Sequence, residues 1–573
     1  MPTTTTGGRR IDWRANGLGT IVDWAVASHA RAVAVLLAVA LISFVPGLFA
    51  MPPVDRDEAR FAQATKQMLE SGDYIDIRFQ DDVRYKKPIG IYWLQAAVVK
   101  AGDALGKRNA LTTIGLNRIP SLIGAVGAVL LTYWTALAFV SRRAAVLAGL
   151  MMASSILLGV EARLAKTDAM LLATIVAAMG ALGRAYLGER RIKPGFAGWI
   201  WPALFWTSLA FGMLLKGPLI LLFIGLTIVT LGILDRSLRW LLVLRPLAGI
   251  IWLAVLVCPW FITIMSRSGD AFVAESVGRD LLPKIFSCQE GHSACPGFYF
   301  IVFWVTFWPA ATLAGAAAPA VWASRHEKGA RFLLAWIVPA WILLELVMTK
   351  LPHYVLPLYP AIAILIAGVI DSHMLARARW IVRGAAWWFV LPVLLGICGI
   401  AGLVLFGRQL GLLAWPFVAG AVVLGLLAWR LLEADGAERS LLRAVTASIM
   451  LSAAAFGIIV PSLSSLFPSL QIARALRAAG CANPVAAAAG YHEPSLVYLV
   501  GTATKLVDGN GAADFLHLGG CRFAIVESRH ERGFLRRADA IGLRYAPGPR
   551  IEGYNYNVGR WLSIAIYRAD GVP

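Results

Sequence analysis

The chain has 573 residues, of which 58% are hydrophobic and 15% are charged. This balance is typical of polytopic membrane proteins and excludes an ordinary water-soluble protein. The formal net charge is +20 at pH 7, but the lysines and arginines stand mostly in short segments between apolar runs, as in cytoplasmic loops of membrane proteins. We therefore interpret the charge as a membrane signal and expect no nucleic-acid partner.

Apolar runs of about 17 to 25 residues are each long enough to cross the hydrocarbon layer as a helix. By this criterion the sequence predicts about thirteen spans. They begin near Arg31, Leu116, Ala144, Asp168, Trp199, Pro218, Val243, Phe298, Phe332, Val355, Trp388, Leu412 and Leu442. No small-residue cleavage site follows the first run, so we expect a retained anchor rather than a signal peptide.

The Lys and Arg residues of the short loops predict which side of the membrane each loop faces. Placing the N-terminal Arg9, Arg10 and Arg14 in the cytoplasm puts the other strongly basic loops on the same side. The opposite, outer side of the membrane then receives the first loop, at about 51–112, and the chain after about Pro461. We expect a transmembrane domain over residues 1–464 and a soluble domain on the outer side over 465–573.

Two segments of the first loop have a helical pattern but are too short and too polar to span a membrane. They are DEARFAQATKQMLESGD, from Asp57, and PIGIYWLQAAVVKAGDALG, from Pro88. Their apolar residues recur at helical spacing among charges, which predicts amphipathic helices lying along the outer surface of the membrane.

The C-terminal segment is more polar and reads as a small domain. Four apolar pieces look like strands, namely VAAAAGY, SLVYLVG, RFAIVES and WLSIAIYR, and the segments DGNGAAD and APGPR between them look like turns. The predicted fold is therefore an α-helical polytopic membrane protein with surface helices on the outer side and a small C-terminal α/β domain.

The six cysteines divide by location. Cys258 and Cys398 lie inside apolar runs, where buried thiols are expected. Cys288 and Cys295 share one outer loop, and Cys481 and Cys521 share the C-terminal segment, so each of these two pairs is a candidate disulfide in an oxidising compartment.

Ionisable motifs are concentrated at or next to the outer ends of the predicted spans. They are VDRDEAR from Val54, VRYKKPIGIYW from Val83, EARLAKTD from Glu161, LLKGP from Leu214, ESVGRD from Glu275 and TKLPHYVLPLYP from Thr349. These motifs are far apart in the sequence, but a helix bundle brings the ends of its helices around one cavity.

Each motif also has a structural interpretation. Asp57 and Glu58 are suited to the N-terminus of a helix, and Lys87 is suited to reach a lipid headgroup. His353 and Tyr354 at the edge of a span are suited to anchor it at the membrane interface. Asp168 is harder to explain in this way, because a carboxylate is costly near the hydrocarbon layer.

Carboxylates beside several cations fit a substrate that carries a phosphate and a second polar or cationic group. A proton-coupled transporter would place its ionisable residues near the membrane midplane, often in internal repeats, and the sequence has no evident repeat. This pattern favours chemistry at the membrane surface on a lipid-borne substrate.

The motifs DEARFAQATKQMLESGDY and VRYKKPIGIYWLQ resemble the first loop of the bacterial 4-amino-4-deoxy-L-arabinose lipid A transferases, which are membrane glycosyltransferases of the GT-C type related to the protein O-mannosyltransferases. The resemblance continues through ARLAKTDAMLL, LLKGPLILL, GHSACPGFYF and TKLPHYVLPLYPA, and in the C-terminal segment through GYHEPSLVYLVG and EGYNYNVGRWLSIAIYR. It covers nearly the whole chain in order.

The resemblance implies an activity. It is the transfer of 4-amino-4-deoxy-L-arabinose from undecaprenyl phosphate to a phosphate of lipid A at the periplasmic face, which gives resistance to cationic antimicrobial peptides such as polymyxin. Undecaprenyl phosphate-aminoarabinose as donor, lipid A as acceptor and membrane lipids are the expected partners, and we expect a monomer.

The family's motifs fall on residues of this chain. The acidic pair of the first loop falls on Asp57 and Glu58, the Lys before Pro falls on Lys87, and the Thr-Asp pair falls on Thr167 and Asp168. We expect the catalytic residues among Asp55, Asp57, Glu58 and Asp168, and the binding residues among Arg60, Arg84, Tyr85, Lys86, Lys87, Arg279, Lys350, His353 and Tyr354. One departure is that relatives often have Phe-Glu-Lys-Pro where this chain has Tyr-Lys-Lys-Pro.

The expected reaction is a direct displacement with inversion at the sugar C1, through an oxocarbenium-like transition state. We assign Lys87, with Arg84, Lys86 or Arg279, to the leaving phosphate, and Asp57, with Asp55, to the acceptor or to the developing positive charge. Glu58 or Asp168 would hold the sugar's ammonium group or the cations. The sequence requires no cofactor, and a divalent cation is compatible with the carboxylates.

Three alternatives stay open at this point. One is a transferase that uses a different polyprenyl-phosphate sugar and acts on protein or another glycan. The others are a lipid or ion transporter, which would not cleave the donor, and a membrane scaffold without catalysis.

Overall fold

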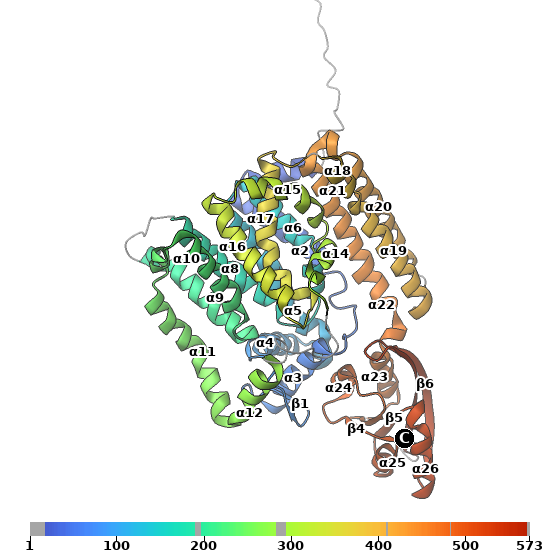
Figure 1. Ribbon diagram of the computed structural model, residues 1–573. Coiled ribbons are helices and arrows are strands. Elements are labelled where there is room, and N and C mark those ends of the chain that lie inside the picture. The colour runs from blue at the N-terminus through green and yellow to red at the C-terminus, as the bar shows by residue number, and fades with distance from the viewer. Residues whose placement is uncertain are drawn as a thin grey trace, which may run out of the picture.

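The computed structural model describes residues 18–188, 196–281, 294–376, 378–407, 409, 411–481 and 483–569. It consists of a large helical bundle and a smaller domain that contains a sheet (Figure 1). The first part of the bundle contains α1 (Leu18–Val26), α2 (His29–Phe44), α5 (Ile114–Ala136), α6 (Arg142–Ala153), α7 (Ile156–Glu161), α8 (Asp168–Leu187), η2 (Phe196–Trp199), α9 (Ile200–Lys216), α10 (Leu219–Asp235), η3 (Arg239–Leu244) and α11 (Pro246–Ser268).

The bundle continues to residue 462. Its second part contains α12 (Asp270–Val273), η4 (Ala274–Leu281), α14 (Phe298–Thr306), α15 (Ala311–Ala323), α16 (Lys328–Leu346), η5 (Pro352–Leu358), α17 (Tyr359–Asp371), α18 (Arg379–Gly384), α19 (Trp387–Phe406), η6 (Leu412–Ala414), α20 (Trp415–Arg430), α21 (Leu432–Ala454), η7 (Ala455–Ile459) and α22 (Val460–Ser462).

The helices make the chain a multi-pass membrane protein. In the described part of the chain, eight helical stretches are long and apolar enough to cross a membrane, or nine if the bent pair α14 and α15 forms one span. Three shorter apolar helices, α2, α9 and α10, lie among them. The number thirteen stays a prediction.

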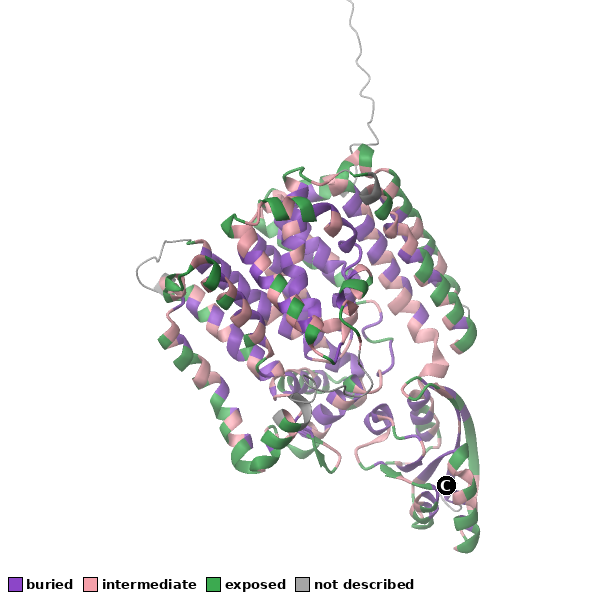
Figure 2. Cartoon of the chain, in the orientation of Figure 1, coloured by how far each residue is buried: buried purple, intermediate pink, exposed green. Residues whose placement is uncertain are grey.

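Helices α5 and α8 form the centre of the bundle and are mostly buried, whereas α11 and α19 expose most of their surface at its edges (Figure 2). The two central helices approach closely at Gly124, where an added Cβ would lie 2.5 Å from the backbone nitrogen of Met170. Only glycine fits there without displacing backbone. This contact places Arg118 of α5 and Asp168 of α8 at the same end of the bundle.

The first loop forms a layer at that end. It contains α3 (Asp57–Ser71), the short strands β1 (Arg78–Phe79) and β2 (Asp82–Val83), α4 (Gly90–Ala104) and η1 (Ala110–Thr112). Both predicted loop helices are therefore present. However, α3 does not expose a polar face as a surface helix would, because Gln63 and Lys66 are buried where the C-terminal domain covers it.

The C-terminal domain begins after η8 (Ser464–Leu466). It contains α23 (Pro468–Ala478), β3 (Val485–Ala489), α24 (Pro494–Val500), β4 (Lys505–Val507), α25 (Gly509–His517), β5 (Arg522–Glu527), α26 (Ser528–Ala540), β6 (Tyr545–Asn555) and β7 (Arg560–Ala569). The sheet order is β4-β3-β5-β7-β6. Strand β3 is parallel to β4 and β5, and β7 is antiparallel to β5 and β6, so the predicted α/β class is confirmed.

Three local predictions in this domain are wrong. The run SLVYLVG is helix α24, because Pro494 occupies its first turn and a short apolar run is ambiguous between a strand and a buried helix. The segment DGNGAAD starts α25, where the Asp508 carboxylate accepts a hydrogen bond from Gly511 N at 2.7 Å. The segment APGPR lies within β6, and the register shifts between Pro547 and Arg550 on this edge strand, where prolines are tolerated.

One of the two predicted disulfides is confirmed. Cys481 and Cys521 are bonded, with their Cα atoms 6.0 Å apart. The bond joins the chain after α23 to the start of β5. The other predicted pair includes Cys288, which lies outside the described residues.

Candidate functional site

The ends of five elements meet beneath the first loop. Asp57 and Asp168 stand in the first turns of α3 and α8, and Lys216 stands in the last turn of α9. Acidic groups are stabilised at a helix N-terminus and cations at a C-terminus. The α7–α8 connection and η5 complete this face, so the packing of the bundle gathers motifs that are distant in the sequence, as predicted.

Asp168 is the centre of a cluster of alternating charges. Lys216 Nζ lies 2.5 Å from Asp168 Oδ1, and Lys166 Nζ lies 3.9 Å from Oδ2. Lys166 Nζ also lies 3.1 Å from Glu161 Oε1. The ring of His353 lies between the two carboxylates, with Nε2 3.7 Å from Asp168 and Nδ1 3.8 Å from Glu161. We call these five residues the charge cluster.

Asp57 is the acidic residue of the first loop that remains open to this face. Its side chain is exposed, whereas the neighbouring Glu58 is buried. Partial burial raises the pKa of Asp57, but the positive charges of Lys166 and Arg84, with a smaller effect of Lys87, outweigh it and hold the pKa below its ordinary value. Asp57 is therefore an ionised and accessible carboxylate among cations.

Arg84 is a second charged residue of this face, and one of its hydrogen-bond donors has no partner within the described residues. It is buried, its guanidinium lies 5.2 Å from the ring centroid of Phe61, and its Nε has no hydrogen-bond partner within the described residues. A buried donor without a partner is costly, and a bound anion would satisfy it. Lys87 donates a hydrogen bond from Nζ to its neighbour's carbonyl, Lys86 O, at 2.9 Å.

Glu58 holds a cation, which is one of the two roles expected for it, but this cation is the buried Arg118 and not a residue of the charge cluster. Arg118 donates to both of its oxygens, from Nε and from Nη2, each at 2.8 Å, and the two side chains are almost completely buried. Val54 N and Ala165 N donate to the same carboxylate at 2.9 and 2.8 Å. These four donors occupy both oxygens of the buried carboxylate and tie the start of α3 to α5 and to the α7–α8 connection.

Asp55 also faces away from the charge cluster. Its Oδ1 accepts a hydrogen bond from Ser495 N at 2.9 Å, and its own N–H donates to the Tyr556 hydroxyl at 2.6 Å. Burial, together with the nearby charge of Glu493, raises the pKa of Asp55 to about 7. Of the two aspartates of VDRDEAR, the structure places Asp57 at the open face and Asp55 at the C-terminal domain.

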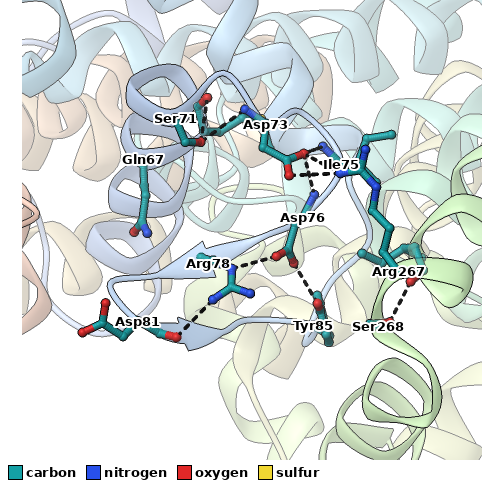
Figure 3. A network of polar contacts seen from close by, with 12 residues as sticks. Gln67, Ser71, Asp73, Ile75, Asp76, Arg78, Asp81, Tyr85, Arg267 and Ser268 are labelled. Carbon is teal, nitrogen blue, oxygen red and sulfur yellow. Dashed lines mark hydrogen bonds and ion pairs between the residues drawn. The ribbon is translucent and has the colours of Figure 1, made fainter.

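Tyr85 belongs to a structural network within the first loop (Figure 3). Its hydroxyl donates to Asp76 at 2.7 Å, and Asp76 also pairs with Arg78. Arg267, at the end of α11, pairs with Asp73 at 3.0 Å and ties the same loop to the bundle. Tyr85 therefore holds the loop and does not point into the charge cluster.

The other expected residues divide in a similar way. Tyr354 lies beside the charge cluster, because the centroid of its ring is 5.4 Å from Lys216 Nζ. Lys350 is buried and donates to Val347 O at 2.7 Å. Arg60 and Lys86 are partly exposed. The side chain of Arg279 lies outside the described residues.

Three residues of the charge cluster were missing from the expected site. They are Glu161, Lys166 and Lys216. Each stands in a segment with a recognisable signal, since EARLAKTD contains the first two and LLKGP the third. The sequence shows that these ionisable residues stand near span ends but not which partners they meet.

A divalent cation has one candidate set of ligands in the described residues. Oxygens of Glu161 and Asp168 and a ring nitrogen of His353 lie within 4.8 Å of one another. However, the ammonium groups of Lys166 and Lys216 already contact the same two carboxylates. Two cations thus balance the charge of the two carboxylates, and a divalent ion would compete with them for the same oxygens.

The sequence and the fold are similar to those of known membrane proteins. A family model described as dolichyl-phosphate-mannose-protein mannosyltransferase matches residues 34–268. The crystal structure of ArnT from Cupriavidus metallidurans bound to undecaprenyl phosphate matches with a TM-score of 0.70 and 17% sequence identity, covering 93% of this chain and 97% of that one. The same protein in the apo state matches with a TM-score of 0.69. The class is thus a multi-pass membrane protein with the GT-C fold, as predicted.

Curated relatives are undecaprenyl phosphate-alpha-4-amino-4-deoxy-L-arabinose arabinosyl transferases. The protein of Erwinia tasmaniensis is 28% identical over 325 residues, which are 54% of this chain and 54% of the relative. That of Edwardsiella ictaluri is 27% identical over 420 residues, which are 69% of each chain. The resemblance seen in the motifs is confirmed, although the chain spans about half the length of the first of these relatives.

Proposed function

We propose that this chain is a membrane glycosyltransferase that moves 4-amino-4-deoxy-L-arabinose from undecaprenyl phosphate to a phosphate of lipid A. The observation that carries the proposal is the position of Asp57, an exposed carboxylate near Lys87. The positive charges of Lys166 and Arg84 lower its pKa. This combination suits a reaction in which a phosphate leaves, a second phosphate attacks and the sugar carries an ammonium group. The named relatives and the ArnT fold support the same reaction.

In the proposed reaction, the bond between the sugar C1 and the oxygen of undecaprenyl phosphate breaks. An oxygen of the lipid A phosphate forms the new bond to C1 from the opposite face, so the configuration inverts. The acceptor phosphate is already largely ionised near pH 7, so the step needs no strong general base. Negative charge grows on the leaving phosphate and positive charge on the sugar ring.

The residues of the open face take roles from these charges. Arg84 and Lys87 stabilise the leaving phosphate, and the unpartnered Arg84 Nε supports this role. Asp57 stabilises the positive charge of the ring or of the sugar's ammonium group. Asp168 holds Lys216 and Lys166, so it acts on the substrate through these cations rather than by direct contact.

The proposal includes a location and an effect on the cell. The protein lies in the inner membrane with its N-terminus in the cytoplasm, and the site and the C-terminal domain face the periplasm. It acts as a monomer. Aminoarabinose adds a positive charge to lipid A, which weakens the attraction of cationic peptides such as polymyxin.

Mass spectrometry of lipid A tests this function. Cells that lack the gene are complemented with the natural protein, with Asp57→Asn, or with Asp103→Asn, an exposed aspartate on α4 that serves as a matched control. We expect the aminopentose on lipid A with the natural protein and with Asp103→Asn, and a loss on the order of 100-fold with Asp57→Asn. Lipid A that is unchanged by deletion of the gene would contradict the proposed acceptor.

A transferase with another acceptor and a transporter are separated by the fate of the donor. Purified protein in sealed vesicles receives undecaprenyl phosphate-aminoarabinose and lipid A. The proposal expects free undecaprenyl phosphate and modified lipid A in equal amounts. Donor that crosses the bilayer without cleavage would identify a transporter.

A further inference from the structure

The turn that carries Asp57 into the site has a strained backbone. Arg56, directly before α3, has φ 69° and ψ −112°. L-residues other than glycine rarely adopt positive φ, and such a conformation persists only where its surroundings enforce it. The residues around the turn therefore determine where Asp57 points.

The bundle holds one side of the turn. Val54 N–H donates to Glu58 Oε2 at 2.9 Å, and the same carboxylate is locked by the buried Arg118. Arg118 also donates to the carbonyls of Leu48, Met51 and Pro52. These contacts fix the chain that enters the turn.

The C-terminal domain holds the other side of the turn. Its hydrogen bonds to the turn join residues that are 440 to 501 positions apart in the sequence. Asp55 N–H donates to the Tyr556 hydroxyl at 2.6 Å, and Ser495 N–H donates to Asp55 Oδ1 at 2.9 Å. Arg56 Nη2 donates to Asn557 O at 3.4 Å. Tyr556 and Asn557 form the tip of the β6–β7 hairpin.

The hairpin tip is itself held by Glu493. Asn555 Nδ2 and Asn557 Nδ2 each donate to one oxygen of this carboxylate at 2.7 Å. The motifs GYHEPSLVYLVG and EGYNYNVGRWL therefore meet each other at the turn that precedes Asp57. We call Glu493, Asn555, Tyr556 and Asn557 the hairpin clamp.

The domain that carries the clamp is firmly seated on α3. Lys66 Nζ donates to Tyr498 O at 3.1 Å, and Gln63 Nε2 donates to Thr502 Oγ1 at 2.8 Å. Asn117 Nδ2, on α5, donates to the buried Tyr498 hydroxyl at 3.1 Å. The hairpin clamp therefore belongs to a domain that is hydrogen-bonded to both α3 and α5.

We infer that the hairpin clamp positions Asp57 for sugar transfer, and that Tyr556 is its central positioning residue. This inference rests on the proposed function, because it gives the C-terminal domain a part in the same reaction. Tyr556 acts through the backbone of Asp55 and has no contact with the substrate. Removing its hydroxyl leaves the Asp55 N–H without its acceptor and weakens the hold of the C-terminal domain on the strained turn.

Kinetics of the purified full-length protein test this inference. Tyr556→Phe is compared with Tyr554→Phe, on the same hairpin, whose hydroxyl makes no hydrogen bond within the described residues. We expect Tyr556→Phe to lower kcat roughly ten-fold and to leave the KM for the donor within about two-fold, because the phosphate-binding cations do not move. Tyr554→Phe should match the natural protein. Equal kcat values for the two variants would overturn the inference.

A double-mutant cycle separates positioning from general loss of folded protein. If Tyr556 acts through Asp57, Tyr556→Phe should have almost no further effect on the residual activity of Asp57→Asn. A variant that merely lowers the folded fraction would cause the same loss in both backgrounds, and that result would contradict the inference. Glu493→Gln, which keeps the size of the side chain, provides a second variant and should show the same coupling to Asp57.

Hydrogen exchange gives a readout that does not depend on the reaction. We expect amides of residues 54–60 to exchange at least several-fold faster in Tyr556→Phe than in Tyr554→Phe, because the turn opens more often. If the natural protein transferred no sugar but the turn still loosened, the proposed function would fail and the clamp would stand as a structural device. Equal exchange in the two variants would show that the hairpin clamp does not hold the turn.

Discussion

Lys216 and Asp168, 48 positions apart in the sequence, form an ion pair in which Nζ and Oδ1 are 2.5 Å apart. Their side chains are only 11% and 8% exposed. A pair at such depth loses much of its hydration, so each charge depends on the other and on its remaining neighbours. The pair therefore ties the end of α9 to the start of α8 beneath Asp57.

Removing the two charges of this pair should have unequal effects on stability. Asp168→Asn leaves Lys166 and Lys216 with Glu161 as their remaining cluster carboxylate, and we expect a loss of about 3 kcal/mol or more. Lys216→Met leaves Asp168 beside Lys166, so the loss should be smaller. Thermal unfolding in detergent measures both. The reverse order would show that Lys166 does not compensate for the loss of Lys216.

Glu58→Gln should destabilise the fold and should not act on the reaction directly. It leaves the completely buried Arg118 without its carboxylate, at a cost of about 3 to 5 kcal/mol in the free energy of unfolding. Glu70→Gln, on the same helix, is the control, because Glu70 is 35% exposed and its pair with Lys66 is wider, at 3.8 Å. That change should cost about 1 kcal/mol or less. If Glu58→Gln unfolds like the natural protein but transfers no sugar, Glu58 acts on the substrate after all.

Docking of the C-terminal domain should depend on pH through Asp55. Burial, and then the charge of Glu493, raise the pKa of Asp55 from 3.8 to about 7 in the docked state, against the opposing effects of Ser495 and Arg60. The docked state therefore binds the proton more tightly than the undocked state. Docking is strongest below pH 3.8, weakens as pH rises toward 7, and is constant above that value. The pKa values of Tyr491 and Tyr556, which also face Asp55, are raised, so these groups stay neutral in this range.

Hydrogen exchange of the β6–β7 hairpin tip, corrected for intrinsic rates, measures this effect. We expect greater protection at pH 5 than at pH 8 in the natural protein. Asp55→Asn resembles the protonated state and should keep the high protection at both pH values. A natural protein with equal protection at both would show that Asp55 does not control docking.

Removal of divalent cations should leave sugar transfer unchanged. Lys166 and Lys216 already supply the positive charge that Glu161 and Asp168 require. We therefore expect the protein, after dialysis against EDTA, to transfer sugar at a rate within about two-fold of the untreated protein. Activity that disappears with EDTA and returns with magnesium or manganese would assign a metal to the reaction.

Local patterns in the sequence predict much of the architecture. Long apolar runs indicate the bundle, helical spacing indicates α3 and α4, and the strand character of VAAAAGY, RFAIVES and WLSIAIYR is confirmed in β3, β5 and β7. These predictions succeed because backbone satisfaction in lipid and the burial of one face depend on residues that are neighbours in the sequence. The run SLVYLVG fails because so short an apolar segment takes its structure from what it packs against.

The sequence by itself determined that this is a polytopic membrane protein with carboxylates and cations at the outer ends of its helices, and its motifs carried the resemblance to aminoarabinose transferases. Only the tertiary structure decided which charge meets which. It gave Glu58 to Arg118, Asp168 to Lys216 and Asp55 to the C-terminal domain, and left Asp57 open. The reason is physical. The energy of a charge depends on partners within a few ångströms, and the packing of the chain brings together residues as far as 501 positions apart.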